Sequence, residues 1–227
     1  MLKVGLTGGI ASGKTVIGDM FVALGAHLVQ ADRIAHELMR PGQLVYNEVV
    51  RHFGGAILNP DLSVNRAKLA EAAFGPANSS LPANPAAAPS ATTSQIQSRV
   101  QELNRIVHPA VIRAQEEWMA EMGRQDPNAI AIVEAALILE AGAAKRFHRL
   151  IVVTCSDELR VARFAARHKL ALEAAQQEVA RRMAAQLPEA EKIKAADYVI
   201  DNSGSLDHTR EQVRQVWQVL QNQASSN

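Results

Sequence analysis

Five short apolar segments along the chain have the pattern of buried strands. They are rich in aliphatic and β-branched residues and lack strict alternation of apolar and polar positions, which is typical of parallel strands covered on both faces. The segments span residues 3–7, 26–30, 129–133, 149–154 and 198–201. Longer stretches with helical periodicity separate them. The alternation predicts an α/β fold with a five-stranded parallel sheet flanked by helices.

The interval between the second and third strands has helical patterns of its own, and we expect a helical insertion there. Within it, residues 72–98 contain no charged residue and four of the nine prolines. Such a composition buries little apolar surface and predicts a flexible loop over residues 76–96. We therefore expect that a short connector can replace residues 77–95 without loss of stability or activity.

Composition and charge exclude several classes of protein. The 227 residues carry a formal net charge of +1, which argues against a general nucleic-acid binder. The sequence contains no run of 18 apolar residues, so we expect no membrane-spanning helix. The single cysteine excludes an internal disulfide framework and a cysteine-cluster zinc site. We expect a cytoplasmic protein that binds neither nucleic acid nor membrane; the sequence does not determine the oligomeric state, and a monomer is our expectation.

Residues 8–15, GGIASGKT, match the phosphate-loop pattern G-x-x-x-x-G-K-[ST] between a predicted strand and a predicted helix. The glycines let backbone amides surround phosphate oxygens, and the start of the helix favours an anion. Lys14 is expected to contact the β- and γ-phosphates of ATP, and the Thr15 hydroxyl to ligate Mg²⁺. The residues expected to bind ATP here are Gly8, Gly9, Ala11, Ser12, Gly13, Lys14, Thr15 and Val16.

The loop by itself does not select one function. ATPases, GTPases and small-molecule kinases share it, and a glycine-rich turn with a chance lysine is the structural alternative. Asp32 follows the second predicted strand, at the sheet edge where parallel sheets bind ligands. Its carboxylate could accept a hydroxyl proton during phosphoryl transfer or reach Mg²⁺ through water. It could equally be the N-cap of the next helix, and both interpretations remain open at this point.

An ordered set of motifs resembles the dephospho-coenzyme A kinase family. It covers essentially residues 1–220, apart from the uncharged segment, and is more specific than the phosphate loop alone. The motifs are residues 7–15, Ala31-Asp32-x-x-Ala35, Phe53-Gly54, Asn65-Arg66-x-x-Leu69, Phe74, Ile106-Val107-His108-Pro109, residues 137–140, Gln186-Leu187-Pro188, Lys192 and residues 196–204. Three positions depart from the family pattern. Ala136 stands where the family usually has proline, Leu139 where it has an aromatic residue, and Thr15 where serine is commoner, which keeps the hydroxyl.

The resemblance implies transfer of the ATP γ-phosphate to the ribose 3′-hydroxyl of dephospho-coenzyme A, with Asp32 as catalytic base beside Lys14. It also implies a P-loop nucleotide kinase fold with a helical acceptor-binding insertion and a helical lid. The implied parts are a nucleotide-binding core of residues 1–31, 129–158 and 196–227, an acceptor-binding domain of residues 32–128, and a lid of residues 159–195.

Five arginines lie on two predicted helices of the lid. Arg160, Arg163 and Arg167 have i, i+3, i+7 spacing and share one helix face, while Arg181 and Arg182 lie on the next helix. Such a surface could bind phosphates, or it could be a solvated face paired with acidic residues. The acidic candidates for such pairing are Asp157, Glu158 and Glu178. The family resemblance favours Arg163 and Arg167 as ATP contacts and Arg182 as a lid residue, and leaves the other two undecided.

The turn after the last strand holds Asn202 and Gly204, for which the resemblance implies contacts with the nucleotide base. An ordinary turn with Ser205 or Asp207 capping the last helix is the alternative. On the acceptor side, the resemblance points to Arg66 and His108. We expect Pro109 to hold His108 in extended or turn geometry. Glu134, at the end of the third strand, is either an outer-sphere Mg²⁺ partner or a simple polar strand end.

Two rival functions remain on the sequence alone. Another small-molecule or nucleoside monophosphate kinase would share every catalytic feature described above. A nucleotide-dependent switch is the rival of another class. The Asn-Lys-x-Asp motif by which GTPases read the base is absent from the sequence, and paired basic lid helices suit transfer better than switching. For the kinase interpretation, ATP as a substrate and Mg²⁺ are expected.

Overall fold

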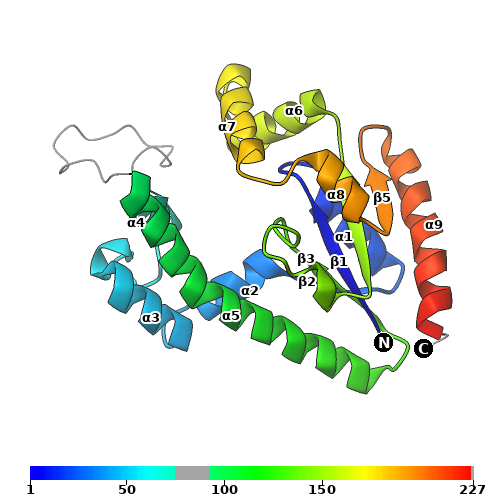
Figure 1. The fold of residues 1–227 in the computed structure, drawn as a ribbon, viewed down its shortest axis with the longest axis horizontal. Coiled ribbons are helices and arrows are strands. Elements are labelled where there is room, and N and C mark those ends of the chain that lie inside the picture. Colours follow the sequence, from blue (N-terminus) through cyan, green and yellow to red (C-terminus); the bar gives the residue numbers. More distant parts are fainter. Residues whose placement is uncertain (75–92, 226–227) are drawn as a thin grey trace. The chain divides into compact units, whose positions relative to one another are not determined.

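The computed structural model describes residues 1–74 and 93–225. Its centre is one sheet of five parallel strands in the order β2-β3-β1-β4-β5 (Figure 1). The strands are β1 Leu2–Gly8, β2 His27–Gln30, β3 Ile130–Glu134, β4 Arg149–Thr154 and β5 Tyr198–Asp201. The predicted α/β fold with five parallel strands is confirmed, with strand bounds within one residue of the sequence prediction.

The parallel register gathers the carboxyl ends of all five strands at one edge of the sheet. Leu6 of β1 pairs with Glu134 of β3, and Gln30 of β2 pairs with the same glutamate. On the other side of β1, Gly8 pairs with Val153 of β4. Gln30, Glu134 and the segment after Gly8 are therefore neighbours although far apart in sequence, which is the usual place for a ligand site in such a sheet.

Nine α-helices and two short 3₁₀ turns make up the rest of the described chain. The helices are α1 Lys14–Ala23, α2 Ala31–Leu38, α3 Leu44–Phe53, α4 Arg66–Phe74, α5 Thr93–Gln125, α6 Asp157–His168, α7 Leu172–Ala184, α8 Glu189–Ala195 and α9 Leu206–Ser225. The 3₁₀ turns are Gly55–Ile57 and Ala144–Arg146. Helix α8 was not foreseen from the sequence, where its residues were assigned only to the end of the lid.

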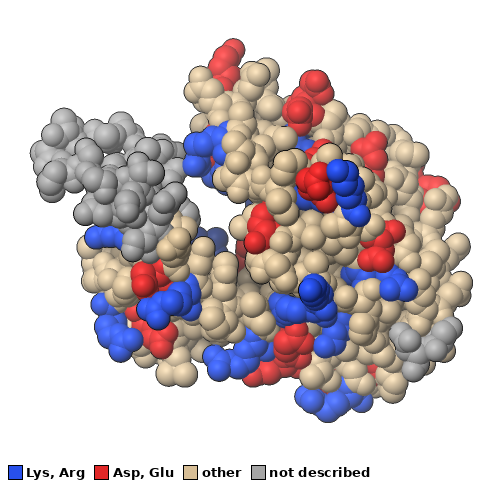
Figure 2. Space-filling model, in the orientation of Figure 1, with Lys and Arg blue, Asp and Glu red and all other residues tan. Residues whose placement is uncertain are grey.

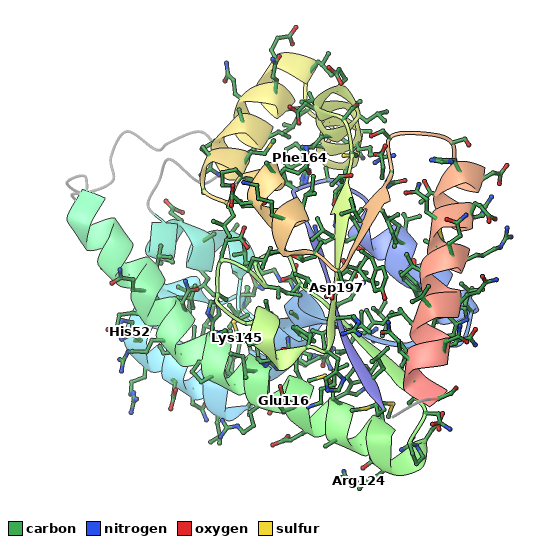
Figure 3. All side chains as sticks on the ribbon, turned by 45° about the vertical axis from the view of Figure 1, so that its right-hand side comes forward. His52, Glu116, Arg124, Lys145, Phe164 and Asp197 are labelled. Carbon is green, nitrogen blue, oxygen red and sulfur yellow. The ribbon has the colours of Figure 1, made fainter. Side chains whose placement is uncertain are left out.

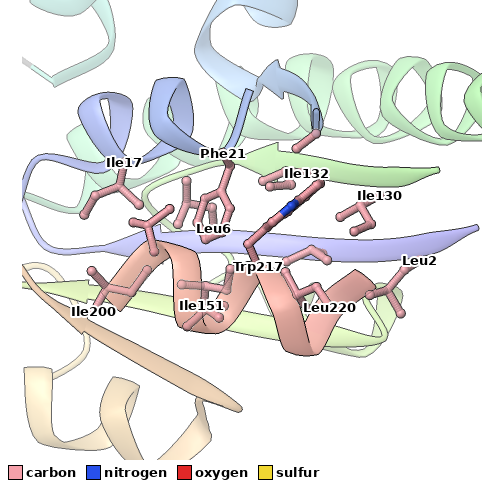
Figure 4. Close-up of a cluster of buried hydrophobic side chains, with 14 of the residues drawn as sticks. Leu2, Leu6, Ile17, Phe21, Ile130, Ile132, Ile151, Ile200, Trp217 and Leu220 are labelled. Atoms are coloured by element: carbon pink, nitrogen blue, oxygen red, sulfur yellow. The ribbon is translucent and has the colours of Figure 1, made fainter. Parts of the chain in front are cut away.

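Helices α1 and α9 cover one face of the sheet. Alternate residues of β1 point to this face, and Phe21 of α1 and Trp217 of α9 pack in the same buried cluster (Figure 4). The rings of Phe21 and Trp217 lie 6.4 Å apart between centroids. Each large apolar side chain buried in this way contributes roughly 1.5–3 kcal/mol relative to exposure. The apolar residues Val213, Val216, Trp217 and Leu220 of α9 thus form the stripe that meets the sheet.

The opposite face of the sheet is covered as well. Met119 of α5 packs on Ala131 and Val133 of β3. Beside them, Ile138 of the segment after β3 packs on Leu150 of β4. Because both faces are covered, the central strands β3, β1 and β4 are almost entirely buried and lack strict alternation, whereas the edge strands β2 and β5 are mostly half-buried or exposed.

The chain separates into two compact units. One unit comprises Met1–Ala31 and Glu117–Asn227 and contains the sheet, and the other is Asp32–Glu116. In the second unit, α3, the turn Gly55–Ile57 and α4 form a small core in which Val49 and Ile57 are buried. The division into nucleotide core, acceptor domain and lid stays a prediction; helices α6 and α7 belong to the sheet unit.

Helix α5 corrects one sequence expectation and shortens another. His108 and Pro109 lie inside it, so the expected extended or turn geometry at His108 is wrong. A proline inside a helix removes one backbone hydrogen bond, and the rest of this 33-residue helix continues across it. The helix begins at Thr93, so the last residues of the predicted 76–96 loop are helical. The remainder of that segment, and with it most of the connector replacement, lies outside the described residues.

Charged side chains of both signs are interspersed over the surface. Figure 2 shows Lys and Arg next to Asp and Glu on the visible face, in keeping with 24 basic and 23 acidic residues. Many of them form exposed pairs one helical turn apart, such as Arg210 with Asp207, which stabilise a fold only slightly. Within the described residues, no helix is both long enough and apolar enough to cross a membrane.

Candidate active site

The phosphate loop between β1 and α1 is held from behind by hydrogen bonds to its carbonyl groups. Lys14 Nζ donates to the carbonyl oxygens of Gly8 at 3.0 Å and Gly9 at 2.9 Å. Asn202 Nδ2 donates to the backbone carbonyl oxygen of Ser12 at 2.9 Å. In a trans peptide the carbonyl and the next amide point in opposite directions, so carbonyls tied on one side turn the following amides to the other. This arrangement suits a backbone cradle for an anion.

Gly13 shows why the loop needs a glycine next to Lys14. Its backbone has φ 93°, in the left-handed region that favours glycine. A Cβ built at this position would overlap the amide nitrogen of Asn202. Asn202 is itself 3% exposed, and its Oδ1 accepts a hydrogen bond from the Thr209 hydroxyl at 3.1 Å. The turn after β5 and the phosphate loop are therefore fitted to one another.

A hydroxyl and a carboxylate meet at the end of the loop. Thr15 Oγ1 donates to Glu134 Oε1 at 2.9 Å, and Gln30 Nε2 donates to Glu134 Oε2 at 3.0 Å. Glu134 is 9% exposed. Hydroxyl and carboxylate oxygens are the protein ligands that Mg²⁺ prefers. These residues fit the expected metal. In the described part of the chain, no group of three or more His, Cys, Asp or Glu side chains could hold a metal ion.

Several buried polar atoms lack a hydrogen-bond partner among the described residues, and two of them bear on phosphate binding at the loop. These two are Nη1 of Arg163 and Oγ of Ser12. Nη2 of Arg163 donates to the carbonyl oxygen of Asn202 at 2.9 Å, which holds the guanidinium next to the loop. Unpaired buried polar groups are costly, and phosphate oxygens would satisfy both. Arg163 is therefore brought to the phosphate loop, as the resemblance implied.

The other arginines of α6 lie differently. Arg167 is exposed in the last turn of the helix. Arg160, which the sequence left undecided, is buried with 1% of its side chain exposed and contacts the carbonyl oxygen of Ile10 in the loop. The three arginines predicted to share one helix face therefore differ in burial: Arg160 is buried at one end of the face, and Arg167 is exposed at the other.

The arginines of α7 form exposed ion pairs. Arg181 Nη2 lies 2.8 Å and Arg182 Nε 2.6 Å from Glu178 Oε1. Arg182 also lies over the ring of Phe164, labelled in Figure 3, at 5.4 Å from the centroid. Hydrogen bonds from Arg181, with a smaller contribution from Arg182, lower the pKa of Glu178 from 4.5 to about 2. These contacts fit the alternative of a solvated helix face paired with acidic residues. A lid role of Arg182 stays a prediction.

Cys155 follows β4 directly beneath the loop. It is 4% exposed, and its thiol lies 3.8 Å from the carbonyl oxygen of Ala11. Burial raises the pKa of this thiol, and the guanidiniums of Arg160 and Arg163 act in the opposite direction. Cys155 is thus a small buried residue at a strand end, and its thiol has a packing role.

Three predicted site residues belong to the Asp32–Glu116 unit. Asp32, Arg66 and His108 are all exposed. Helix α2 begins at Ala31, so Asp32 lies in its first turn and the N-cap alternative is wrong. An acidic residue in a first turn is favourable, because the helix dipole is positive there.

Arg66 lines a pocket within the Asp32–Glu116 unit. The pocket has a volume of about 520 Å³. Other residues that line it are His36, Arg40, Asn59, Asp61 and Ser63. Two guanidiniums and an imidazole outnumber the one carboxylate, Asp61, and lie beside amide and hydroxyl groups, which suits a ligand with anionic and hydrogen-bonding groups. His108 is not among the lining residues.

The remaining predicted residues sit at the rims of these elements. Val16 is 46% exposed in the first turn of α1, and Gly204 is exposed in the turn after β5. Ser205 caps α9, since its hydroxyl accepts a hydrogen bond from the His208 amide at 3.2 Å. The capping alternative for that turn is thereby confirmed for Ser205, while the base contacts of Asn202 and Gly204 stay predictions.

Three residues at the loop were not foreseen as parts of the site. Gln30 and Thr209 orient Glu134 and Asn202, and Glu189 of α8 pairs with Arg160 at 2.8 Å. For Gln30 the signal was its position at the end of a strand next to β3. Glu189 had no local signal, because its partner Arg160 is 29 residues away in sequence, and nothing in the pattern of the last helix marked Thr209 as the partner of Asn202.

Comparison with known proteins agrees with this geometry. A family model described as dephospho-CoA kinase matches residues 2–102 and 92–208. The dephospho-CoA kinase of Corynebacterium jeikeium is 36% identical over 96% of this chain and 98% of its own. That of Aquifex aeolicus is 33% identical over 97% of this chain and 98% of its own.

Solved structures are similar as well. A Thermus thermophilus structure has a TM-score of 0.73 at 28% identity and covers 96% of each chain. Dephospho-CoA kinase from Campylobacter jejuni has a TM-score of 0.64 at 25% identity and covers 97% of each chain. A shikimate kinase from Acinetobacter baumannii, with a TM-score of 0.50 and 13% identity over 98% of this chain and 94% of its own, shares the fold alone.

Proposed function

The chain belongs to the dephospho-CoA kinase family, and on this basis we propose how its residues divide the work of the reaction. The reaction moves the γ-phosphate of ATP to the ribose 3′-hydroxyl of dephospho-CoA and gives coenzyme A and ADP, the last step of coenzyme A synthesis. The observation that supports the division most strongly is the loop itself, with its carbonyls tied back and an unpaired buried guanidinium nitrogen beside it.

ATP is held by the phosphate loop. The loop amides bind the phosphate oxygens, and Lys14 turns from the Gly8 and Gly9 carbonyls toward the β- and γ-phosphates. Arg163 adds a second charge through its unpaired Nη1. Fixed positive groups of this kind stabilise the charge that spreads over the transferred phosphoryl group. Arg167, Asn202 and Gly204 are proposed to contact the rest of the nucleotide.

Mg²⁺ would be held by the Thr15 hydroxyl, with Glu134 beside it. When bound, the ion neutralises charge on the β- and γ-phosphates. Gln30 keeps the Glu134 carboxylate turned toward Thr15. Thr15, Gln30 and Glu134 all lie within the sheet unit, so the proposed Mg²⁺ site needs no residue of the Asp32–Glu116 unit.

The acceptor is bound and activated by residues of the Asp32–Glu116 unit. We assign Arg66 and its pocket to the anionic part of dephospho-CoA, because two arginines line that pocket. In the transfer step the 3′-oxygen forms a bond to the γ-phosphorus as the bond to the ADP oxygen breaks. ADP leaves with the electron pair, and the hydroxyl proton passes to the Asp32 carboxylate.

A panel of acceptors tests this assignment. With ATP and Mg²⁺, coupled detection of ADP should show turnover with dephospho-CoA that exceeds turnover with AMP, adenosine or shikimate by several orders of magnitude. Equal or faster turnover of AMP would remove the acceptor assignment and leave a kinase of another substrate. ADP release at the same rate with no acceptor would indicate a nucleotide hydrolase or switch instead.

A further inference from the structure

Arg160 joins three segments of the sheet unit behind the phosphate loop. Its Nη1 donates to the Ile10 carbonyl oxygen at 2.9 Å. Its Nη2 donates to the Cys155 carbonyl oxygen at 3.1 Å and to Glu189 Oε1 at 2.8 Å. Its Nε lies 3.4 Å from Asp157 Oδ1. One planar guanidinium therefore contacts the loop, the residue after β4 and the first residue of α8.

The loop backbone rests directly on this guanidinium. A Cβ built at Gly9 would overlap Nη1 of Arg160, so Gly9 is needed for close approach. The side chain of Arg160 is 1% exposed, whereas that of its partner Glu189 is 32% exposed. A buried charge is costly unless it is paired and hydrogen-bonded. Here the ion pair with Glu189 and two carbonyls satisfy the two terminal nitrogens and hold the guanidinium in one place, while Nε has no hydrogen-bond partner among the described residues.

The contact with Ile10 has a consequence for phosphate binding. All described peptide bonds are trans, so the Ala11 amide points away from the carbonyl that Arg160 holds. Asn202 does the same for the Gly13 amide by holding the carbonyl of Ser12. The two side chains thus hold the loop at the carbonyl groups of Ile10 and Ser12, which are two residues apart.

We propose that Arg160 is a positioning residue for ATP: it fixes the Ile10–Ala11 peptide so that its amide faces the phosphates, and through Glu189 it ties the loop to the start of α8. The inference rests on the proposed role of the loop in binding ATP. Arginine suits the task because its planar fork reaches three acceptors at once. A lysine offers one compact ammonium and cannot span them all.

Direct measurement of ATP binding by titration calorimetry tests the proposal. Arg160→Met should raise the Kd of ATP by about 10- to 100-fold, the usual effect of losing charge-assisted hydrogen bonds. Arg160→Lys should recover part of the loss. The KM for dephospho-CoA should stay within about twofold of wild type in both variants. Arg214→Gln, which removes an exposed ion pair with Glu211 on α9, is the matched control and should bind ATP normally.

A second variant keeps the test decisive if Arg160→Met does not fold. Glu189→Gln retains an oxygen acceptor but removes the charge that holds the guanidinium, and it should raise the Kd of ATP by about threefold with little change in acceptor KM. Unchanged ATP affinity in the folded variants, or equal losses for both substrates together with a lower melting temperature, would overturn the proposal. Wild-type protein that binds ATP but does not phosphorylate dephospho-CoA would refute the proposed function and leave the test of Arg160 intact.

Discussion

The two compact units carry their functional side chains in opposite ways. In the sheet unit, Asn202, Glu134 and Arg160 are buried. Asn202 and Arg160 donate hydrogen bonds to carbonyl oxygens of the phosphate loop, and Glu134 accepts one from the Thr15 hydroxyl at the end of the loop. In the Asp32–Glu116 unit, Asp32 and Arg66 are exposed. The residues that support the phosphate loop are therefore part of the packing of their unit, whereas Asp32 and Arg66 are exposed side chains that few neighbours hold.

This difference separates two kinds of mutational effect. Truncating a buried partner leaves another buried polar group unpaired, so stability and ligand binding fall together. Truncating an exposed residue that acts on the substrate changes kinetics and leaves the fold intact. The five predictions below use this contrast, from the largest expected effect to the smallest.

Lys14→Ala should cause the largest loss. Without its ammonium group the developing phosphoryl charge loses its closest protein cation, and we expect turnover to fall on the order of 10⁴-fold. Steady-state ADP release measures the loss. Lys194→Ala, which removes only an exposed pair with Glu191, is the control. Retention of a tenth of wild-type activity in Lys14→Ala would show that the loop lysine is not part of the chemistry.

Asp32→Asn keeps the shape of the side chain and removes the proton acceptor. We expect kcat to fall by roughly 10²- to 10⁴-fold, with ATP and acceptor binding changed much less. Because Asp32 is exposed, the melting temperature should stay near that of wild type. A variant that unfolds while its folded fraction keeps full specific activity would instead assign Asp32 to helix stability.

Asn202→Ala should lower both stability and ATP affinity. The change leaves the Ser12 carbonyl without the Asn202 amide and leaves the Thr209 hydroxyl only its longer contact with the Ser205 carbonyl oxygen at 3.3 Å. The loss costs about 1–3 kcal/mol of unfolding free energy. We expect ATP binding about tenfold weaker. Thr209→Val removes only the outer hydroxyl and should cost less in both measurements. Urea unfolding and calorimetry check the pair; a normal free energy of unfolding in Asn202→Ala would break the contrast between the units.

Arg66→Gln should act on the acceptor alone. We expect the KM for dephospho-CoA to rise about fivefold, with the ATP KM and the melting temperature unchanged. Arg105→Gln removes an exposed pair with Glu102 on α5 and serves as the charge-matched control. A rise in ATP KM for Arg66→Gln would mean that the pocket does not belong to the acceptor.

Glu178→Gln should have the smallest effect. The folded-state pKa of Glu178 is depressed from 4.5 to about 2, so the ionised carboxylate stabilises the fold above pH 4.5. That contribution is lost as the pH falls from 4.5 toward 2, when the folded state also takes up the proton. With both arginine partners half exposed, we expect about 1 kcal/mol. A stability difference that does not change between pH 6 and pH 2 would contradict this.

The fold followed from local pattern wherever local pattern decides structure. Strands 149–154 and 198–201 have the predicted bounds, because short aliphatic and β-branched runs are recognisable without their neighbours. The phosphate loop is likewise a contiguous motif whose strand and helix follow in order. Ser205 caps α9 through a contact three residues away.

What the sequence did not show depends on distant contacts. The i, i+3, i+7 spacing places Arg160, Arg163 and Arg167 on one helix face, but it does not say that the loop, 150 residues away, buries only one end of that face. The buried pair of Lys192 with Glu140 has the same character. At Pro109, the packing of a long helix prevailed over the local preference of the preceding residue.

The central claim is that the γ-phosphate passes from the loop to one particular hydroxyl. Incubation of the protein with ATP, Mg²⁺ and dephospho-CoA, followed by phosphorus NMR of the product, tests it most directly. The account predicts one new phosphate monoester on the ribose 3′-oxygen for each ADP formed, and no transfer to the 3′-deoxy analogue of dephospho-CoA. Equal ADP formation with the 3′-deoxy analogue, or a phosphate at any other position, would contradict the account.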